Sequence, residues 1–434
     1  MLKRKNFFAL SLMSFGIFFG AGNLIFPPSV AQLAGSNIWS AYFGFLITTV
    51  ILPILGIITV AKTDGLLNLG RKVDPFFAYI ITIGILLAIG PGLAIPRTGS
   101  TSFEMAIKPW LNSEMSTTMP LILYSAVYFG LVALLCWTPN KIIDRIGRFS
   151  TPALLVLILL LTILAFTHQQ PTLLEPSNGY ETAAFTTGFL SGYNTLDTLA
   201  GLNYGLLIVT AVRNLKVDES KVVKIATKAG IVAGVVLALV YWCLTIIGQY
   251  GADKVEVGAN GANILVAAST LLLGKFGTLV LGTIFVLACF NTCVGLITSI
   301  SQFFHRILPQ LSYHTYVVIL TLWSFALANI GLDGILTYSV PILVLLYPIA
   351  ITLIILTLTD NWLHHSQLTY RIIAYVVSFI SIINSLVSMG IKIPILTALT
   401  EALPLADQGL NWMLPVIILM IMAYFTTNRQ AVPN

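Results

Sequence analysis

The chain has 434 residues, of which 57% are hydrophobic and 9% are charged, whereas about a quarter of the residues in soluble domains are charged. This composition excludes a soluble globular protein and predicts an all-helical protein that crosses a membrane many times. The formal net charge of +6 comes from lysines and arginines spread along the chain. They form no basic cluster, so no nucleic-acid partner is indicated.

The first predicted span, roughly residues 7 to 30, contains an interruption in the run FGIFFGAGNLIFPP. Three glycines and a proline pair disfavour one continuous helix there: Gly16, Gly20, Gly22, Pro27 and Pro28. We expect two half-helices, and if Asn23 caps the second, both prolines fall within or near its first turn. The free backbone groups must line a cavity or bind something, which predicts a site at membrane depth.

About twelve spans follow from the hydrophobic runs, most of them longer than the ~20 residues that a bilayer requires. The first span lacks a small-residue cleavage site, so it is expected to be retained rather than removed as a signal peptide. The expected spans cover residues 7 to 30, 38 to 61, 76 to 101, 119 to 137, 150 to 167, 184 to 211, 226 to 250, 271 to 304, 315 to 332, 335 to 358, 370 to 390 and 410 to 427.

No linker or low-complexity tract divides the chain, so residues 1 to 434 are expected to form a single membrane domain. The longest segments between spans are 102 to 118, 251 to 270 and 391 to 409, and they are expected on the outer side. Most of the 22 lysines and arginines fall in the other loops, which places both termini in the cytoplasm. This side includes Arg71, Lys72, Arg213 and Arg306, and the outer side keeps Arg97, Lys108, Lys254, Lys275 and Lys392.

Span six carries a second interruption, in which glycines surround the polar residues Tyr193, Asn194, Thr195 and Asp197. Five spans separate the two interruptions, so the broken helices run in opposite directions. This spacing predicts an inverted repeat of five plus five helices, about 7 to 167 and 184 to 358, with two extra helices over about 370 to 427. Interrupted segments at matching positions of two halves are the sequence pointer to a transporter's binding site.

Four separated motifs resemble the bacterial branched-chain amino acid:cation symporter family, a distant relative of the leucine-transporter fold. They are FFGAGNLIFPP at 18 to 28, GPGLAIPRT at 90 to 98, GYNTLDTLAG at 192 to 201 and ACFNTCVGL at 288 to 296. The resemblance covers nearly the whole chain. It implies a multi-pass transporter of the bacterial cytoplasmic membrane, with surrounding lipid, no cofactor, and Na⁺ as the coupling ion.

The resemblance also implies a sodium site between the unwound part of span one and the middle of span eight. The carbonyls of Gly16 and Phe19 would contribute from span one, and Ala288, Asn291 and Thr292 from span eight. Oxygen ligands suit a hard cation. The family often has a hydroxyl residue where Asn291 stands. Alternatively, Asn291 and Thr292 only bond to neighbouring helices.

A branched-chain amino acid, namely leucine, isoleucine or valine, is the implied substrate. Its carboxylate would lie near Gly20 and the free amides of Ala21, Gly22 and Asn23, at the positive end of the second half-helix. Its ammonium would meet span six, where Tyr193, Asn194 and Thr195 are candidates for closing the site. Asn23 serves either as a cap or beside the sodium.

Two ionisable residues near these interruptions are notable because charges inside a membrane are costly and often functional. Asp197 is expected to receive the substrate ammonium, influence cation coupling or pair with a basic residue. Arg97, near the outer end of span three, is a possible partner. Interfacial water and Glu104 are the alternative partners for Arg97.

An enzyme is not expected, because the chain lacks the HExxH and Walker motifs and only Asp197 stands at membrane depth. The prediction is therefore sodium-coupled import by alternating access. A proton-coupled amino acid transporter and an ion channel remain as alternatives, and no feature of the sequence indicates an oligomeric state.

Overall fold

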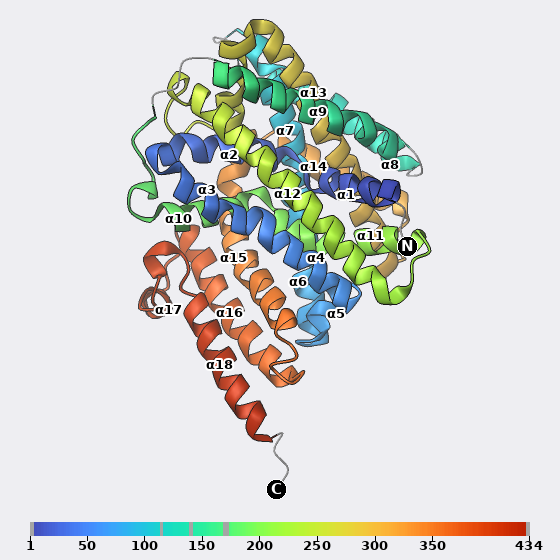
Figure 1. The fold of residues 1–434 in the computed structure, drawn as a ribbon, viewed down its shortest axis with the longest axis vertical. Coiled ribbons are helices and arrows are strands. Elements are labelled where there is room, and N and C mark those ends of the chain that lie inside the picture. Colours follow the sequence, from blue (N-terminus) through green and yellow to red (C-terminus); the bar gives the residue numbers. More distant parts are fainter. Residues whose placement is uncertain (1–3, 113–115, 139–141, 168–172, 431–434) are drawn as a thin grey trace.

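This computed structural model describes residues 4–112, 116–138, 142–167 and 173–430, and the described part consists of helices and their connections with no strand (Figure 1). The N-terminal elements are α1 (Arg4–Phe18), α2 (Ala21–Ala34), η1 (Gly35–Asn37), α3 (Ile38–Leu46), η2 (Ile47–Ile51), α4 (Leu52–Thr63), α5 (Leu66–Arg71), α6 (Pro75–Leu87), η3 (Ala88–Gly92), α7 (Ala94–Ala106), η4 (Lys108–Trp110), α8 (Thr118–Trp137) and α9 (Ile142–Thr167).

The C-terminal elements begin after the connection that follows α9. They are α10 (Tyr180–Ser191), η5 (Gly192–Thr195), α11 (Asp197–Asn214), α12 (Glu219–Gly251), η6 (Ala252–Lys254), α13 (Gly261–Ile307), α14 (Tyr313–Ala328), α15 (Leu332–Leu358), α16 (Gln367–Ser388), α17 (Pro394–Glu401), η7 (Ala406–Gln408) and α18 (Met413–Gln430).

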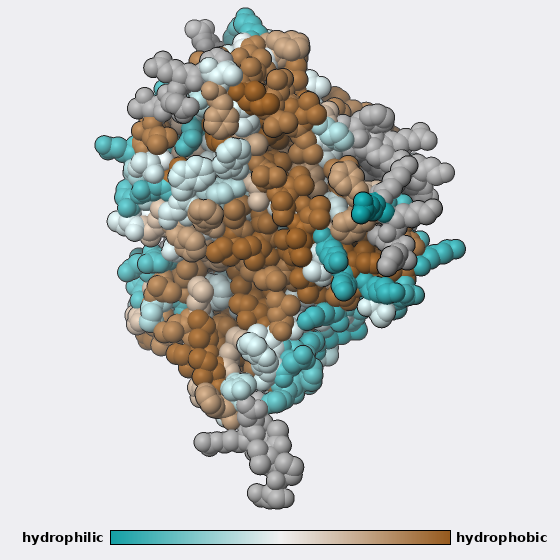
Figure 2. Space-filling model, viewed as in Figure 1, coloured by the Kyte–Doolittle hydropathy of each residue, from teal (hydrophilic) through white to brown (hydrophobic). Residues whose placement is uncertain are grey.

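Among the described residues, length and hydropathy identify seven helical stretches that can cross a membrane, or up to eight if the bent pair Tyr180–Thr195 and Asp197–Asn214 is one span. Four shorter apolar helices accompany them. The surface agrees, since Figure 2 shows a broad hydrophobic band between hydrophilic edges. Helix α12 contributes exposed Ile231, Val235 and Leu239 to the surface. The chain is therefore an all-helical, multi-span membrane protein, as predicted.

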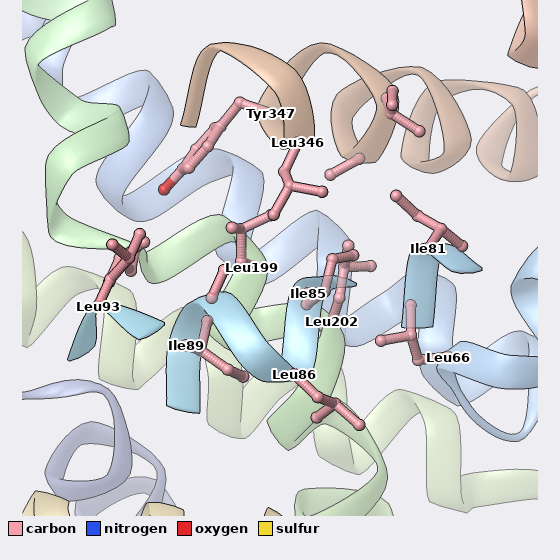
Figure 3. Close-up of a cluster of buried hydrophobic side chains, with 14 of the residues drawn as sticks. Leu66, Ile81, Ile85, Leu86, Ile89, Leu93, Leu199, Leu202, Leu346 and Tyr347 are labelled. Atoms are coloured by element: carbon pink, nitrogen blue, oxygen red, sulfur yellow. The ribbon is translucent and has the colours of Figure 1, made fainter. Parts of the chain in front are cut away.

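Tight apolar packing holds the central helices together. In the cluster drawn in Figure 3, Ile85 and Ile89 of the α6–η3 segment lie among Leu199 and Leu202 of α11 and Leu346 of α15. All five side chains are buried. Burying such aliphatic side chains contributes roughly 1.5–3 kcal/mol each, so this cluster fixes the helices that carry the polar residues of the site.

Both predicted interruptions are present. Helix α1 ends at Phe18, Phe19 and Gly20 are not helical, and α2 begins at Ala21. In the second, the 3₁₀ turn η5 is followed by Leu196, whose φ of 68° lies in the left-handed region. A leucine there is strained, and the chain bends by 47° between the two halves.

The start of α2 corrects the expected capping. Gly20, not Asn23, occupies the N-cap position, and Asn23 lies three residues into the helix, where its side chain accepts a hydrogen bond from the Gly20 N–H at 2.9 Å. Pro27 and Pro28 consequently lie in the second turn rather than the first. Since neither proline has an N–H, the carbonyls of Asn23 and Leu24 lose their usual helical partners.

The three long connections contain more helix than expected. Residues 102 to 106 belong to α7, and α17 lies within 391 to 409. Helix α13 already begins at Gly261, because the Asn260 side chain caps it by accepting from the Asn263 N–H. Gly274, with φ of 62°, then interrupts α13, so hydropathy alone located the membrane part of this helix but missed its leading segment.

Candidate functional site

A buried polar network joins the two interruptions. Asn23 of α2 donates through Nδ2 to both carboxylate oxygens of Asp197, at 2.8 Å each, and Asp197 is the first residue of α11. The hydroxyl of Tyr241, on α12, donates to Oδ2 of Asp197 at 2.7 Å. Asn23 and Asp197 are only 2% and 1% exposed. The carboxylate therefore accepts these hydrogen bonds from neutral donors, in a region shielded from water.

Arg97 of α7 reaches the same region. Its side chain is 2% exposed, and its Nη1 donates to the backbone carbonyl of Asn194 at 2.6 Å. The guanidinium carbon lies 5.4 Å from the centre of the Phe26 ring. None of the three expected partners pairs with Arg97 in the described structure. Asp197 forms no ion pair with it, Glu104 pairs with Lys108 at 2.6 Å, and the burial of Arg97 shields it from interfacial water.

A cavity of about 40 Å³ lies where these elements meet. Its lining includes Gly20, Ala21, Gly22 and Asn23 from the first interruption, Thr195 and Asp197 from the second, and Arg97 and Thr292. One ordered water needs ~10–15 Å³ of such space. The cavity therefore has room for only a few water molecules and is smaller than an amino acid. A substrate of that size requires the surrounding helices to separate.

Tyr193 and Asn194 lie on the other side of η5. They line a second, larger cavity of about 620 Å³, together with residues of α15, α16 and the α17–η7 segment. The Tyr193 ring stacks on Tyr347 of α15, with centroids 4.1 Å apart and planes inclined by 15°. The second interruption thus separates two cavities, with Thr195 and Asp197 facing one and Tyr193 and Asn194 the other.

The structure brings two of the five candidate sodium ligands into contact. Thr292 of α13 donates to the Phe19 carbonyl at 3.2 Å, so these two predicted ligands lie together. In a continuous helix the Gly20 N–H would donate to the Gly16 carbonyl. It donates to the Asn23 side chain instead, so the Gly16 carbonyl lacks that helical partner. Ala288 is buried one turn before Thr292. Asn291 lies outside the lining of the small cavity, although its Oδ1 is buried without a hydrogen-bond partner in the described structure.

Sequence reasoning missed Tyr241, which holds Asp197, and Tyr347, which covers Tyr193. Both are tyrosines in otherwise apolar spans and are completely buried. A buried tyrosine usually directs its hydroxyl to a polar partner. That preference holds for Tyr241, whose hydroxyl meets Asp197, whereas the Tyr347 hydroxyl is buried without a hydrogen-bond partner in the described structure. Only the packing of α12 and α15 shows what each ring contacts.

The fold matches that of a solved structure. The crystal structure of MhsT in complex with L-phenylalanine superimposes with a TM-score of 0.58 over 98% of each chain, at 14% sequence identity. MhsT has the leucine-transporter fold. The class of protein is thus an all-helical membrane protein of this fold, with two broken helices meeting at a buried site.

Sequence comparison gives the family. The model of the branched-chain amino acid transport protein family matches residues 3–430. Branched-chain amino acid permease BrnQ of Bacillus subtilis is 39% identical over 94% of this chain and 93% of its own. The branched-chain amino acid transport system 2 carrier protein of Pseudomonas aeruginosa is 38% identical over 97% and 96%. The chain belongs to this family of transporters and is not an enzyme.

Proposed function

We propose that the protein is a sodium-coupled symporter that imports leucine, isoleucine and valine across the bacterial cytoplasmic membrane. The observation that carries this proposal is the meeting of two broken helices at one buried cavity, in a chain whose relatives are named as branched-chain amino acid permeases. The substrate class comes from those relatives. The walls of the cavity agree with it, since Ile17, Ile89 and Leu296 provide an apolar surface for a branched side chain.

The amino acid lies between the interruptions. Its carboxylate approaches the N-terminus of α2, where Ala21, Gly22 and Asn23 present amides without intrahelical partners. Its ammonium approaches Thr195 and Asp197. The Asp197 carboxylate contacts only neutral donors among the described residues, so an ammonium would supply the charge partner that a buried carboxylate otherwise lacks.

Sodium binds between α13 and the end of α1. The contact between Thr292 and the Phe19 carbonyl supports this position, because both oxygens can turn to a cation when the helices separate slightly. The Gly16 and Ala288 carbonyls and the Asn291 side chain complete the proposed ligand set. Each ligand is an oxygen, as a hard cation prefers.

Alternating access arises from movement around η5. The chain has twelve spans, built as an inverted repeat of five plus five with two extra helices, so both termini lie on one side, and the distribution of lysine and arginine makes that side the cytoplasm. The cavity of about 620 Å³ beside α17 then faces outward, and the Tyr193–Tyr347 stack closes it from the substrate site. Opening that stack admits substrate from outside, and rearrangement of α1 releases it inside.

Counterflow tests the substrate and the carrier mechanism together. Proteoliposomes preloaded with unlabelled leucine should accumulate external labelled leucine transiently, because a carrier exchanges one molecule for another. Unlabelled isoleucine and valine should compete, and lysine and glutamate should not. Absence of counterflow, combined with ion currents that persist without amino acid, would favour the channel. Counterflow of an unrelated amino acid would overturn the substrate assignment.

A further inference from the structure

Arg97 is a buried cation with most of its hydrogen-bonding capacity unused. A guanidinium offers five N–H donors, yet among the described residues Arg97 donates only from Nη1, to the Asn194 carbonyl. Its Nε is buried without a partner, and no carboxylate of the described residues lies within 4.0 Å of it. A charge shielded from water in this way is costly unless an anion approaches it.

The N-terminus of α2 lies against the same guanidinium. A Cβ atom placed on Gly22 would come within 2.5 Å of Nη2 of Arg97, so only a glycine allows this close approach. Helix α2 is 14 residues long, and its first N–H groups carry the positive end of the helix dipole. Two positive features therefore lie side by side at the wall of the cavity, and an anion inside the cavity could be bound by both.

The same cavity also contains a negatively charged side chain, which does not pair with Arg97. Asp197 lines it together with Arg97, but the two side chains form no ion pair, since Asp197 is occupied by Asn23 and Tyr241. The cavity thus presents a cation with free donors and a carboxylate held by neutral groups. A zwitterion that carries a carboxylate at one end and an ammonium at the other matches this arrangement.

We propose that Arg97, together with the amides of Ala21 and Gly22, binds the α-carboxylate of the transported amino acid. This inference rests on the proposed function and adds a charged residue of α7 to the site. The planar guanidinium can offer two parallel donors to a carboxylate, which is the arrangement that makes such pairs strong. The free α-carboxylate then becomes a requirement for binding, independent of the side chain.

The test compares leucine with leucinol, in which a CH₂OH group replaces the carboxylate. Binding of both ligands is measured on the purified full-length protein by thermal stabilisation in detergent. The parent should favour leucine, and Arg97→Gln should weaken leucine binding by roughly 10- to 150-fold. The same variant should leave leucinol binding nearly unchanged. Lys108→Gln is the matched control, because Lys108 pairs with Glu104 outside the cavity lining.

Equal losses of leucine and leucinol binding in Arg97→Gln would overturn the proposal, because they would mean that Arg97 only supports the Asn194 carbonyl. Should Arg97→Gln not elute as a folded peak, Arg97→Lys serves instead. It keeps the charge without the paired donors, so it should weaken leucine binding selectively, and equal losses again contradict the proposal. Failure of the parent to bind any branched-chain amino acid would instead refute the proposed function.

Discussion

At the scale of single residues, the hydroxyl of Thr292 connects α13 to the end of α1 through the Phe19 carbonyl. If it is a sodium ligand, Thr292→Ala removes one oxygen from the ion. Losing such a partner costs about 1–3 kcal/mol, which corresponds to roughly a 5- to 150-fold loss of affinity. The half-saturating sodium concentration for leucine uptake should rise by that order, measured per folded transporter.

Thr298→Ala is the matched control for this substitution. Thr298 lies on the same helix and donates to the Cys136 sulfur at 3.7 Å, away from the cavity lining. Its loss should leave the sodium dependence unchanged. If Thr292→Ala lowers the amount of folded protein while the surviving molecules keep the parental half-saturation, the hydroxyl serves helix packing and is not a ligand.

Asp360 carries a pH-dependent contribution to stability outside the spans. It accepts hydrogen bonds from Lys72 at 2.6 Å and from Tyr370 at 3.1 Å, and its Oδ2 lies 2.8 Å from the Nδ1 of His365. Partial burial alone would raise its pKa, but these partners outweigh burial and hold the pKa below its ordinary 3.8. The carboxylate thus stabilises the fold above pH 3.8, and this contribution is lost as the pH falls through the lower folded-state pKa.

The expected consequence is that Asp360→Asn lowers the melting temperature at pH 7, by the equivalent of about 1 kcal/mol. The difference from the parent should shrink steadily below pH 4. Asp218→Asn is the control, because its pair with Lys221 is largely exposed and contributes little. A difference between Asp360→Asn and the parent that is constant from pH 7 to pH 3 would contradict this account.

Among the residues of the site, the sequence indicated Asn23 and Asp197, because polar groups beside glycines within apolar spans are unusual. The direction of Arg97 was not predictable. The sequence left Asp197, interfacial water and Glu104 open as its partners, and only the close approach to Gly22 shows that it turns inward. The role of Tyr241 likewise depends on the packing of α12 against α2 and α11, which the sequence of α12 does not specify.

At the scale of elements, Gly22 allows α2, α7 and η5 to meet. A Cβ there would lie 2.5 Å from Arg97 Nη2 and 3.2 Å from the Cα of Thr195. The arginine end can shift but the backbone cannot, so Gly22→Ala should displace Arg97 and cost about 1–3 kcal/mol of stability. We expect the free energy of leucine binding to weaken by at least as much as the free energy of unfolding.

Gly130→Ala provides the comparison. Gly130 lies on α8, and an added Cβ would meet nothing within 4 Å. Alanine also favours the helix by ~1 kcal/mol over glycine, so this variant should be slightly more stable and bind leucine normally. Normal leucine binding by folded Gly22→Ala would remove this turn from the site.

The interruptions were predictable as elements, whereas their boundaries were not. Glycines and prolines in an apolar span require a break, but capping decides where the next helix begins. The Asn23 side chain accepts from the Gly20 N–H, so α2 begins closer to the N-terminus than a cap at Asn23 would predict. Asn260 has the same effect on α13. Such side-chain contacts are local, yet several residues in each segment could have made them.

At the scale of the whole molecule, the proposed orientation is tested by labelling cysteines introduced at exposed loop positions. Glu175 precedes α10, and Val257 precedes α13 and is 61% exposed, so both should react with an impermeant thiol reagent applied outside. Ser220, an exposed residue at the start of α12, should react only after the membrane is permeabilised. The reverse pattern would place the termini outside.

The native cysteines make this labelling practical. Cys136, Cys289 and Cys293 are buried and Cys243 is half-buried, so the parent should give little background. Composition and the length of the hydrophobic runs predicted the many spans of the molecule, and the motif resemblance predicted the fold. The packing of these spans around two cavities comes from long-range contacts such as the Tyr193–Tyr347 stack, which no local pattern reveals.

The coupling of leucine import to sodium is tested most directly by uptake into proteoliposomes under separately imposed gradients. We predict concentrative uptake of labelled leucine with an inward sodium gradient at equal pH on both sides, and none with an inward proton gradient in sodium-free buffer. Uptake that ignores sodium and follows the pH gradient would contradict the account and favour proton coupling.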